Sequence, residues 1–405
     1  MKKKWAKRLT IVDGLVLALL VVPLVYAVDA PSGFDNLTNG FTTQAQFDLD
    51  LATFEEFETI DDGLGPVYNA QSCRECHQNP VTGANSQVTE LRVARFDGFF
   101  YTDRPGGSLI NDRAINAAIQ ERVAGADNVA TFRSSLNILG DGFVEAIPDS
   151  FFTNTRNGQP SGMKGTIINV PVLEAAAGTT RIGRFGWKNQ HASLLSFAAD
   201  AYLNEMGITS VLQPTENTSN GTSVASFDGV ADPEDATSAA DPKGIDVSAF
   251  TRFMRSTKTP PRDAVLAATS SAIAGASLFN SVGCNICHVA NITTAPAGTL
   301  INGNTLTVSA AIGGKTIHPY SDFMLHDVGT GDGIVQNGGQ TTANKLRTPP
   351  LWGVRTSARH MHQGQLLTFT ETILQHAGEA TTVINRFRNL SATQRNQIVV
   401  FLQSL

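Results

Sequence analysis

The pattern Cys-x-x-Cys-His occurs twice, and it constrains this chain more than any other feature. The first copy begins at Cys73 and the second at Cys284, and together they use all four cysteines of the 405-residue sequence. This pattern attaches c-type haem: two thioethers hold the porphyrin edge, and the adjacent imidazole binds the iron. We therefore expect two covalently attached haems, held by Cys73, Cys76, Cys284 and Cys287, with His77 and His288 as proximal iron ligands.

Three other roles for the cysteines compete with haem attachment. A disulfide within either pair would be a strained closure, better suited to redox chemistry than to structure. A thioredoxin-like dithiol does not require a histidine after the second cysteine, and here one follows both pairs. A zinc site made from all four thiolates is compatible with the spacing, but it leaves His77 and His288 without a role. The haem interpretation accounts for all six residues.

The first 30 residues have the pattern of an export signal. Five Lys and Arg lie in the first ten residues, an apolar run follows, and small residues allow cleavage after Ala27 or Ala30. Asp13 and Pro23 interrupt the apolar run, which is shorter than the roughly 20 residues of a spanning helix. We therefore expect a cleaved signal over residues 1–30, in preference to a retained membrane anchor, and a periplasmic protein.

The distance between the two motifs predicts two domains. The motifs lie 211 residues apart (284 minus 73), and 41% of the residues are apolar, enough for more than one core. Residues 214–244 are polar and lack periodicity, which is typical of an exposed linker. We place an N-terminal haem c domain at residues 31–245 and a C-terminal haem c domain at residues 246–405.

The charged residues carry little information about partners. The formal net charge is −6, and no block of like charge occurs along the chain. This distribution argues against nucleic acid as a partner.

Helical patterns outnumber strand patterns. Residues 46–57 place Phe47, Leu51, Phe54 and Phe57 on one face of a helix. Residues 109–123 show the same spacing of apolar side chains. A further short apolar-periodic segment covers residues 245–256, and Pro260 and Pro261 break the chain soon after it.

The C-terminal part combines helix caps with irregular segments. Thr368 with Glu371, and Ser391 with Gln394, have the spacing of capping boxes that open two helices. Residues 329–340 are rich in glycine and lack periodicity. We therefore expect a mainly α fold made of two cytochrome c-like haem domains with long irregular loops.

Several segments together resemble one known family. The chain is similar to bacterial di-haem cytochrome c peroxidases, and most closely to the branch called di-haem oxidoreductases or thiol oxidoreductases. The resemblance covers most of the mature chain. Its markers are GLGPVYNAQSCRECH, GDGFVEAIPD, GRFGWKNQHASLLSFAADAYLNEMGITS, LFNSVGCNICH, YSDFMLHDVGTG, LRTPPLWGV and HMHQGQLLTFTETILQHAGEA.

This resemblance implies roles for three further residues. Met361 matches the methionine that is the distal ligand of the C-terminal haem, although His360 and His362 flank it and are rival ligands. Trp187 aligns with the tryptophan that lies between the two haems. Glu205 aligns with the distal carboxylate of the N-terminal haem, where one group could take a proton from peroxide and return it to the departing oxygen. Without the resemblance, Trp187 would read as a core residue and Glu205 as a surface residue before a turn.

The sequence departs from the family at two positions. Phe197 stands where the family has a glutamine, so a hydrogen-bonding distal side chain is lost. No histidine occurs between His77 and His191, so the loop histidine that blocks the N-terminal haem in resting peroxidases is absent. We therefore expect an open N-terminal haem and read His191 as a hydrogen-bonded structural residue. One role considered for His326 is a hydrogen bond to a haem propionate.

The family resemblance also implies an activity and partners. The implied activity is reduction of hydrogen peroxide at the N-terminal haem, with electrons from a cytochrome c or cupredoxin relayed through the C-terminal haem. It further implies a homodimer, and a calcium ion near the segment LRTPPL. Two alternatives stay open: ferryl-dependent oxidation of a protein or small molecule, and electron transfer without catalysis.

Overall fold

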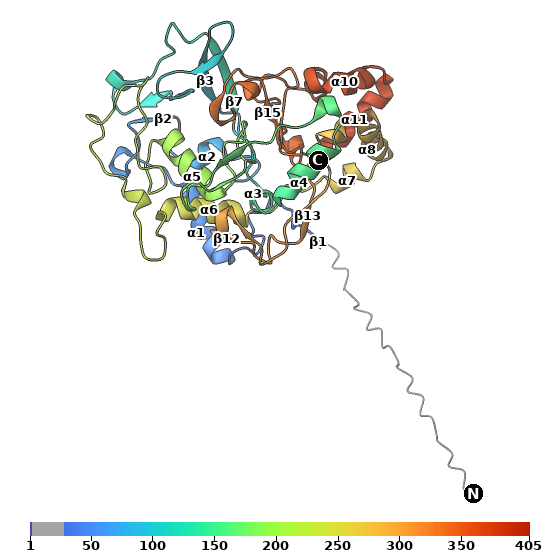
Figure 1. Cartoon of the computed structure of the whole chain (residues 1–405), viewed down its shortest axis with the longest axis horizontal. Helices are drawn as coiled ribbons and strands as arrows, with labels where there is room; N and C mark the ends of the chain where they lie inside the picture. Colours follow the sequence, from blue (N-terminus) through green and yellow to red (C-terminus); the bar gives the residue numbers. More distant parts are fainter. Residues whose placement is uncertain (2–27) are drawn as a thin grey trace.

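The computed structural model of this chain describes residues 28–405 together with Met1 (Figure 1). Most of the predicted export signal therefore lies outside the described residues. Within residues 28–405, none of the helices combines the length and the apolar character that crossing a membrane requires.

The helices are short and separated by long irregular segments. Among the described residues, only α1, α6, α8 and α11 reach 12 or 13 residues. The helices are α1 (Gln44–Glu55), α2 (Cys73–Cys76), α3 (Asp141–Glu145), α4 (Asp149–Gly158), α5 (Leu194–Ala201), α6 (Ile245–Ser256), α7 (Ala264–Ala267), α8 (Ser270–Val282), α9 (Phe369–Leu374), α10 (Thr381–Arg388) and α11 (Ala392–Gln403).

The strands form several small sheets, of which one is substantial. In that sheet β3 pairs antiparallel with β4, β5 and β7. The strands are β1 (Val28–Asp29), β2 (Val67–Tyr68), β3 (Thr89–Phe96), β4 (Tyr101–Asp103), β5 (Leu109–Ile110), β6 (Arg113–Ala114), β7 (Val129–Ser134), β8 (Asn169–Pro171), β9 (Thr180–Ile182), β10 (Ile292–Thr293), β11 (Leu300–Ile301), β12 (Leu306–Thr307), β13 (Lys315–Ile317), β14 (Leu325–His326) and β15 (Leu346–Arg347).

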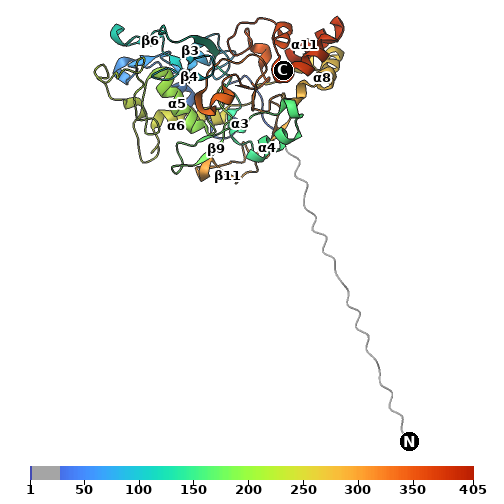
Figure 2. The ribbon, with the colours of Figure 1, turned by 45° about the horizontal axis from the view of Figure 1, so that its top comes forward.

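Two groups of helices lie at opposite sides of the molecule. Helices α1, α5 and α6 pack together on one side, and α8, α10 and α11 on the other, as both views show (Figures 1 and 2). In the first group Phe253 packs against Phe47 and Phe54, with ring centroids 5.4 and 4.7 Å away. In the second group α8 approaches α11 closely, since a Cβ at Gly275 would lie 1.9 Å from the carbonyl oxygen of Gln397.

Each Cys-x-x-Cys-His motif lies at the edge of one apolar core. Cys73 packs against the larger core, and Cys284 and Cys287 pack against the smaller core between α8 and α11. The larger core takes buried residues from both sides of the predicted boundary at residues 245 and 246, for example Phe143 and Phe323. The domain boundary stays a prediction.

Several local predictions are confirmed and two are wrong. Helices α1 and α6 lie where the apolar periodicity placed them, and Ser391 and Gln394 form the reciprocal capping box of α11. Thr368 caps α9 by accepting from the Glu371 N–H. The helix predicted over residues 109–123 is wrong, because this stretch forms β5, β6 and a 3-10 turn. Phe57 was expected on the buried face, but it lies beyond the end of α1 and is exposed.

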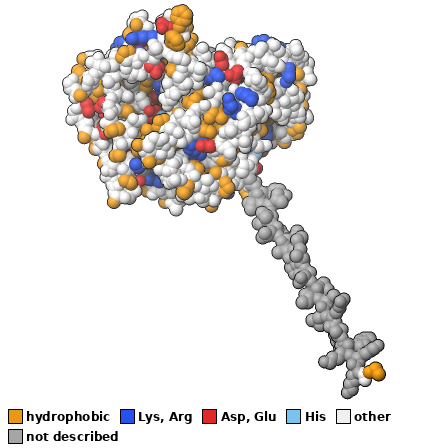
Figure 3. Space-filling model, in the orientation of Figure 1, with side chains coloured by type: hydrophobic (Ala, Val, Ile, Leu, Met, Phe, Trp, Pro, Cys, Tyr) orange, Lys and Arg blue, Asp and Glu red, His pale blue; other side chains and the backbone are white. Residues whose placement is uncertain are grey.

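The polar segment at residues 214–244 and the glycine-rich segment at residues 329–340 are both irregular, as predicted, but each also contains buried side chains. In residues 214–244, Val224 is buried against Val67 and Ile119. In residues 329–340, Asp332 and Ile334 are buried. The surface carries charged side chains of both signs in scattered positions, without a large block of either sign on the face shown in Figure 3.

Candidate functional site

Two large cavities accompany the two cysteine motifs. The first cavity is lined by Cys73, Cys76 and His77 and has an empty volume of about 1760 Å³. The second cavity is lined by Cys284, Cys287 and His288 and has an empty volume of about 1860 Å³. These volumes include the open space at the cavity mouths, and each cavity lies directly against the cysteine pair and the histidine of its motif.

Short turns present both motifs to their cavities. Ser72 caps α2 by accepting from the Arg74 N–H, and the single turn of α2 leads directly into His77. The second motif follows the C-terminus of α8, where Gly283 adopts φ 102° and a 3-10 turn begins at Cys284. Residues three apart share a face of such a turn, so both thiols of each motif lie on one side.

The cysteines are neither disulfides nor reactive dithiols. All four are free. Burial raises the pKa of the Cys73 and Cys284 thiols to about 12, whereas redox dithiols need a lowered pKa. Within residues 28–405 the only group suited to a metal by its side chains is Cys287 with Asp322 and His326, so the four cysteines do not form a zinc site. The thioredoxin-like and zinc alternatives are not supported.

The two motif histidines have the protonation state that an iron ligand needs. Burial lowers the pKa of His77 and of His288 to about 4, so both imidazoles are neutral at pH 7. The Nδ1 of His288 lies 3.0 Å from the carbonyl oxygen of Tyr320. With Nδ1–H donating there, Nε2 keeps its lone pair, which is the usual arrangement for a metal-binding histidine.

Four polar atoms in the wall of the second cavity are buried and have no hydrogen-bond partner. A buried polar group without a partner costs free energy, so these atoms call for a ligand with polar groups of its own. The two propionate carboxylates of a haem are suitable acceptors, and the residues present therefore fit this group. The four atoms are Ser135 Oγ, Asn137 Nδ2, Trp352 Nε1 and His362 Nδ1.

Glu205 lies in the wall of the first cavity. Helix α5 continues into a π-helical turn over Tyr202–Met206 that carries this residue, and such turns occur frequently at functional sites. Asn69 Nδ2 donates to Glu205 Oε2 at 2.8 Å, and the Ala70 N–H donates to the Glu205 carbonyl oxygen at 3.0 Å. These bonds fix the carboxyl group relative to the segment that leads into Cys73.

The first cavity also contains an ion pair that the sequence did not reveal. Glu90 and Arg92 extend from β3 and form two hydrogen bonds, of 2.8 and 2.9 Å. Alternation along a strand puts residues two apart on one face, and polar and apolar side chains alternate over ELRV, residues 90–93. The signal was therefore present, but a strand here was not predicted.

Burial and Glu90 both raise the pKa of Glu205 well above its usual range. Burial also opposes ionisation of Glu90, but the Arg92 guanidinium outweighs it and lowers the pKa of Glu90. At neutral pH Glu205 is therefore protonated and the neighbouring Glu90 is ionised.

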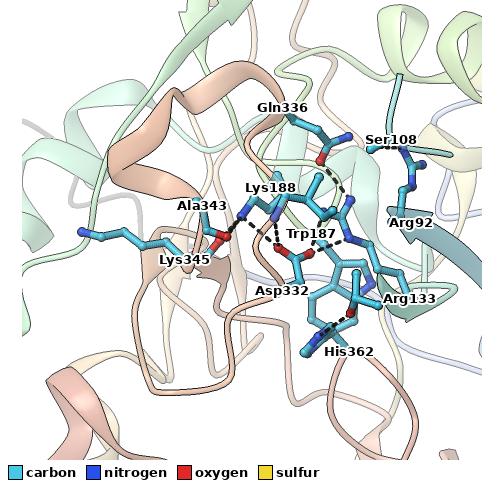
Figure 4. Close-up of polar contacts among 12 residues, drawn as sticks. Arg92, Ser108, Arg133, Trp187, Lys188, Asp332, Gln336, Ala343, Lys345 and His362 are labelled. Carbon is cyan, nitrogen blue, oxygen red and sulfur yellow. Dashed lines mark hydrogen bonds and ion pairs between the residues drawn. The ribbon is translucent and has the colours of Figure 1, made fainter. Parts of the chain in front are cut away.

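Trp187 is one of the residues that line both cavities. Its Nε1–H donates to the Ser134 carbonyl oxygen at 2.8 Å, and its own carbonyl oxygen accepts from the Arg347 N–H at 2.8 Å. The His362 ring stands edge-on to it at 6.1 Å. Figure 4 shows the indole near His362 and a buried ionic cluster of Arg133, Lys188 and Asp332.

The three candidate ligands around Met361 all line the second cavity. His360 stacks on Phe369 with ring centroids 4.6 Å apart. His362 Nε2 lies 3.4 Å from Thr131 Oγ1. Met361 itself adopts φ 66°, a conformation that costs free energy in a residue with a side chain and tends to be kept at functional sites.

Three remaining positions have clear surroundings. His191 pairs with Asp200 at 3.0 Å and lies outside the walls of the first cavity, in agreement with a structural role. Phe197 lines that cavity and stacks on Phe185 at 6.0 Å. Both ring nitrogens of His326 are already bonded, to Asp322 at 2.9 Å and Glu379 at 2.7 Å, so the expected propionate contact is not available.

Comparison with known proteins gives a family match. A family model described as "Di-haem oxidoreductase, putative peroxidase" matches residues 108–405. A comparison with curated proteins found no match.

Several solved structures are distantly similar. A MauG-like protein associated with microbial copper homeostasis is 15% identical, with 94% of this chain and 93% of that chain covered and a TM-score of 0.43. The diheme peroxidase BthA of Burkholderia thailandensis is 13% identical, with 89% and 86% covered and a TM-score of 0.42. The hydrazine synthase of Kuenenia stuttgartiensis is 14% identical, with both chains fully covered (100%) and a TM-score of 0.41.

Proposed function

Because this chain belongs to the di-haem oxidoreductase family, we propose that it reduces hydrogen peroxide in the first cavity with electrons relayed through the second. The observation that carries this proposal is that Glu205 lines the same cavity as His77, where burial and Glu90 raise the pKa of its carboxyl group. Reduction of peroxide to water needs a group that delivers a proton to the departing oxygen.

The proposal assigns the cofactor sites to the two motifs. One haem would be attached through Cys73 and Cys76 with His77 as ligand, and the other through Cys284 and Cys287 with His288 as ligand. When bound, these groups supply redox-active iron. Around the first site the chain contributes Glu205 as the proton donor, with Asn69 holding its carboxyl group in place.

Trp187 is the proposed route between the two sites. Its ring reaches both cavities, and its hydrogen bonds to Ser134 and from Arg347 hold it in one position. Electrons would enter through the second site from a small redox protein, a cytochrome c or a cupredoxin.

We propose Met361 as the second iron ligand in the second cavity. Thioether ligation raises the reduction potential, so the variant Met361→His should lower the midpoint potential of that haem and leave its covalent attachment intact. Spectroelectrochemical titration of the haem-loaded protein measures this change. The variants His360→Ala and His362→Ala serve as controls: if one of them, and not the Met361 variant, shifts the potential, the ligand is that histidine.

Export to the periplasm is also part of the proposal. Val28 and Asp29 form β1 and pair in parallel with β13, and the Ala30 N–H donates to the Thr316 carbonyl oxygen. Since residues 28–30 take part in the fold, cleavage after Ala27 is favoured over cleavage after Ala30. The calcium ion and the homodimer stay predictions.

The direct test is the absorption spectrum of the haem-loaded protein before and after peroxide. We expect a mass increase of two haems, a change of the Soret band on adding peroxide, and oxidation of a reduced small cytochrome during turnover. A spectrum that peroxide leaves unchanged would contradict the proposal and favour electron transfer without catalysis.

Phe197 favours a second candidate function, oxidation of a small organic substrate. Phe197 and the half-exposed Phe132 give the first cavity an apolar wall, where the family's glutamine would offer hydrogen bonds. In that case peroxide would be consumed in the presence of an apolar phenol or amine without any reduced cytochrome.

A further inference from the structure

Four side chains in the first cavity form one hydrogen-bonded series. Arg92 binds both carboxylate oxygens of Glu90, at 2.8 and 2.9 Å. The Glu90 carboxyl group in turn hydrogen-bonds to that of Glu205. Glu205 is held from its other side by Asn69 at 2.8 Å. The order along the series is therefore guanidinium, carboxylate, carboxyl, amide.

Two carboxyl groups in contact cannot both be ionised without strong repulsion, so they share a proton. The Arg92 guanidinium stabilises charge on Glu90, and the proton therefore stays on Glu205. Arg133 also lowers the pKa of Glu90, and Asp200 also interacts with Arg92, but each has its own partner in contact, Asp332 and His191 respectively. The wall of the first cavity contains four further titratable side chains besides Glu90, Arg92, Glu205 and the motif residues. They are Asp112, Arg133, Asp200 and Tyr202.

We propose that Glu90 and Glu205 act together as an acid and a base, with Arg92 as the positioning residue that decides which of them carries the proton. This inference rests on the proposed function for its role in peroxide reduction, but the shared proton does not. It also gives Glu90 a role as a base, which the family resemblance does not imply.

The proton balance uses both groups. Hydrogen peroxide, two protons and two electrons give two waters. The Glu90 carboxylate accepts the proton of a peroxide O–H, the O–O bond breaks, and Glu205 gives its proton to the oxygen that leaves as the first water. The proton on Glu90 then passes to Glu205 through their hydrogen bond. The two electrons come from the small redox protein, and two protons from solvent complete the second water.

Infrared spectroscopy of the haem-loaded protein tests the shared proton independently of activity. A protonated carboxyl group has its own C=O band, and the difference between wild type and Glu205→Gln isolates that of Glu205. The spectrum of the variant is subtracted because other protonated carboxyl groups also give C=O bands. Burial raises the pKa of Asp141 and of Glu216 to about 8 as well. We expect the Glu205 band to be present at neutral pH and to disappear as the pH rises.

The variants of Glu90 and Arg92 should move this titration in opposite directions. In Glu90→Gln the like charge is gone, so the midpoint of the Glu205 band should fall by about one pH unit or more. In Arg92→Gln the Glu90 charge is no longer neutralised, so the midpoint should rise, and Arg92→Lys should restore most of the wild-type value. Glu216→Gln is the matched control and should leave the Glu205 midpoint unchanged.

The rate of peroxide turnover should fall at alkaline pH, and the midpoint of this fall should shift in each variant in the same direction as the infrared midpoint. An unchanged midpoint in Glu90→Gln overturns the inference even if the wild type reduces peroxide. Shifted midpoints in a protein that does not reduce peroxide support the shared proton and overturn the proposed function.

Discussion

Replacing Glu205 with Gln should lower peroxide turnover by about 10²–10⁴-fold, the usual contribution of a general acid–base group. Gln has nearly the same shape and can keep the contact with Asn69, but it cannot donate a proton to the departing oxygen. Haem content and the spectrum of the resting protein should stay as in the wild type. The measurement is the initial rate of peroxide-dependent oxidation of a reduced small cytochrome.

Glu216→Gln provides the control for this variant. Burial also raises the pKa of Glu216 to about 8, yet Glu216 lies outside the walls of the first cavity. Its replacement should leave turnover unchanged. Full turnover by Glu205→Gln would show that the proton comes from another group, and the acid–base assignment would then be wrong.

The second large effect concerns stability. The Asp332 carboxylate is fully buried and contacts Arg133 at 2.6 Å and Lys188 at 3.3 Å, as Figure 4 shows. Three backbone carbonyl oxygens, of Thr342, Ala343 and Lys345, accept from the Lys188 ammonium but carry no charge. Asp332→Asn therefore removes the carboxylate that both buried cations contact. We expect the free energy of unfolding to fall by about 3–5 kcal/mol.

Denaturant unfolding of the haem-loaded protein measures this change. The exposed Asp61 gives a matched substitution, Asp61→Asn, which should stay within about 0.5 kcal/mol of the wild type. The double variant Asp332→Asn with Lys188→Met also removes one of the two cations, so it should recover part of the lost free energy of unfolding. A fall of less than about 1 kcal/mol in Asp332→Asn would show that the two cations do not depend on this carboxylate.

The sequence predicted local features well where the physical signal is local. The periodicity of Phe47, Leu51 and Phe54 gave α1, and the Ser391–Gln394 capping box marked the start of α11. The same reasoning failed for residues 109–123, where pairing with β2 and β3 overrides the apolar spacing. Long-range pairing of this kind leaves no signature within the segment itself.

The buried charges could not be predicted for the same reason. Asp332 lies in a glycine-rich stretch that reads as an exposed loop, and its partners Arg133 and Lys188 come about 200 and 144 residues earlier in the chain. In the sequence, Glu90 and Arg92 look like an ordinary pair of polar residues. In the structure, β3 places both in the wall of the cavity that also contains Glu205. Only the folded chain brings such distant residues together.

The sequence by itself predicted the cofactor-binding residues, because Cys-x-x-Cys-His places two thiols and an imidazole within five residues, where a short turn can present them on one side. Tertiary structure alone decided that Trp187 lines two cavities and that a second carboxyl group stands beside Glu205. The physical reason is that attachment depends on five consecutive residues, whereas the protonation state of a carboxyl group depends on burial and on charges from distant parts of the chain.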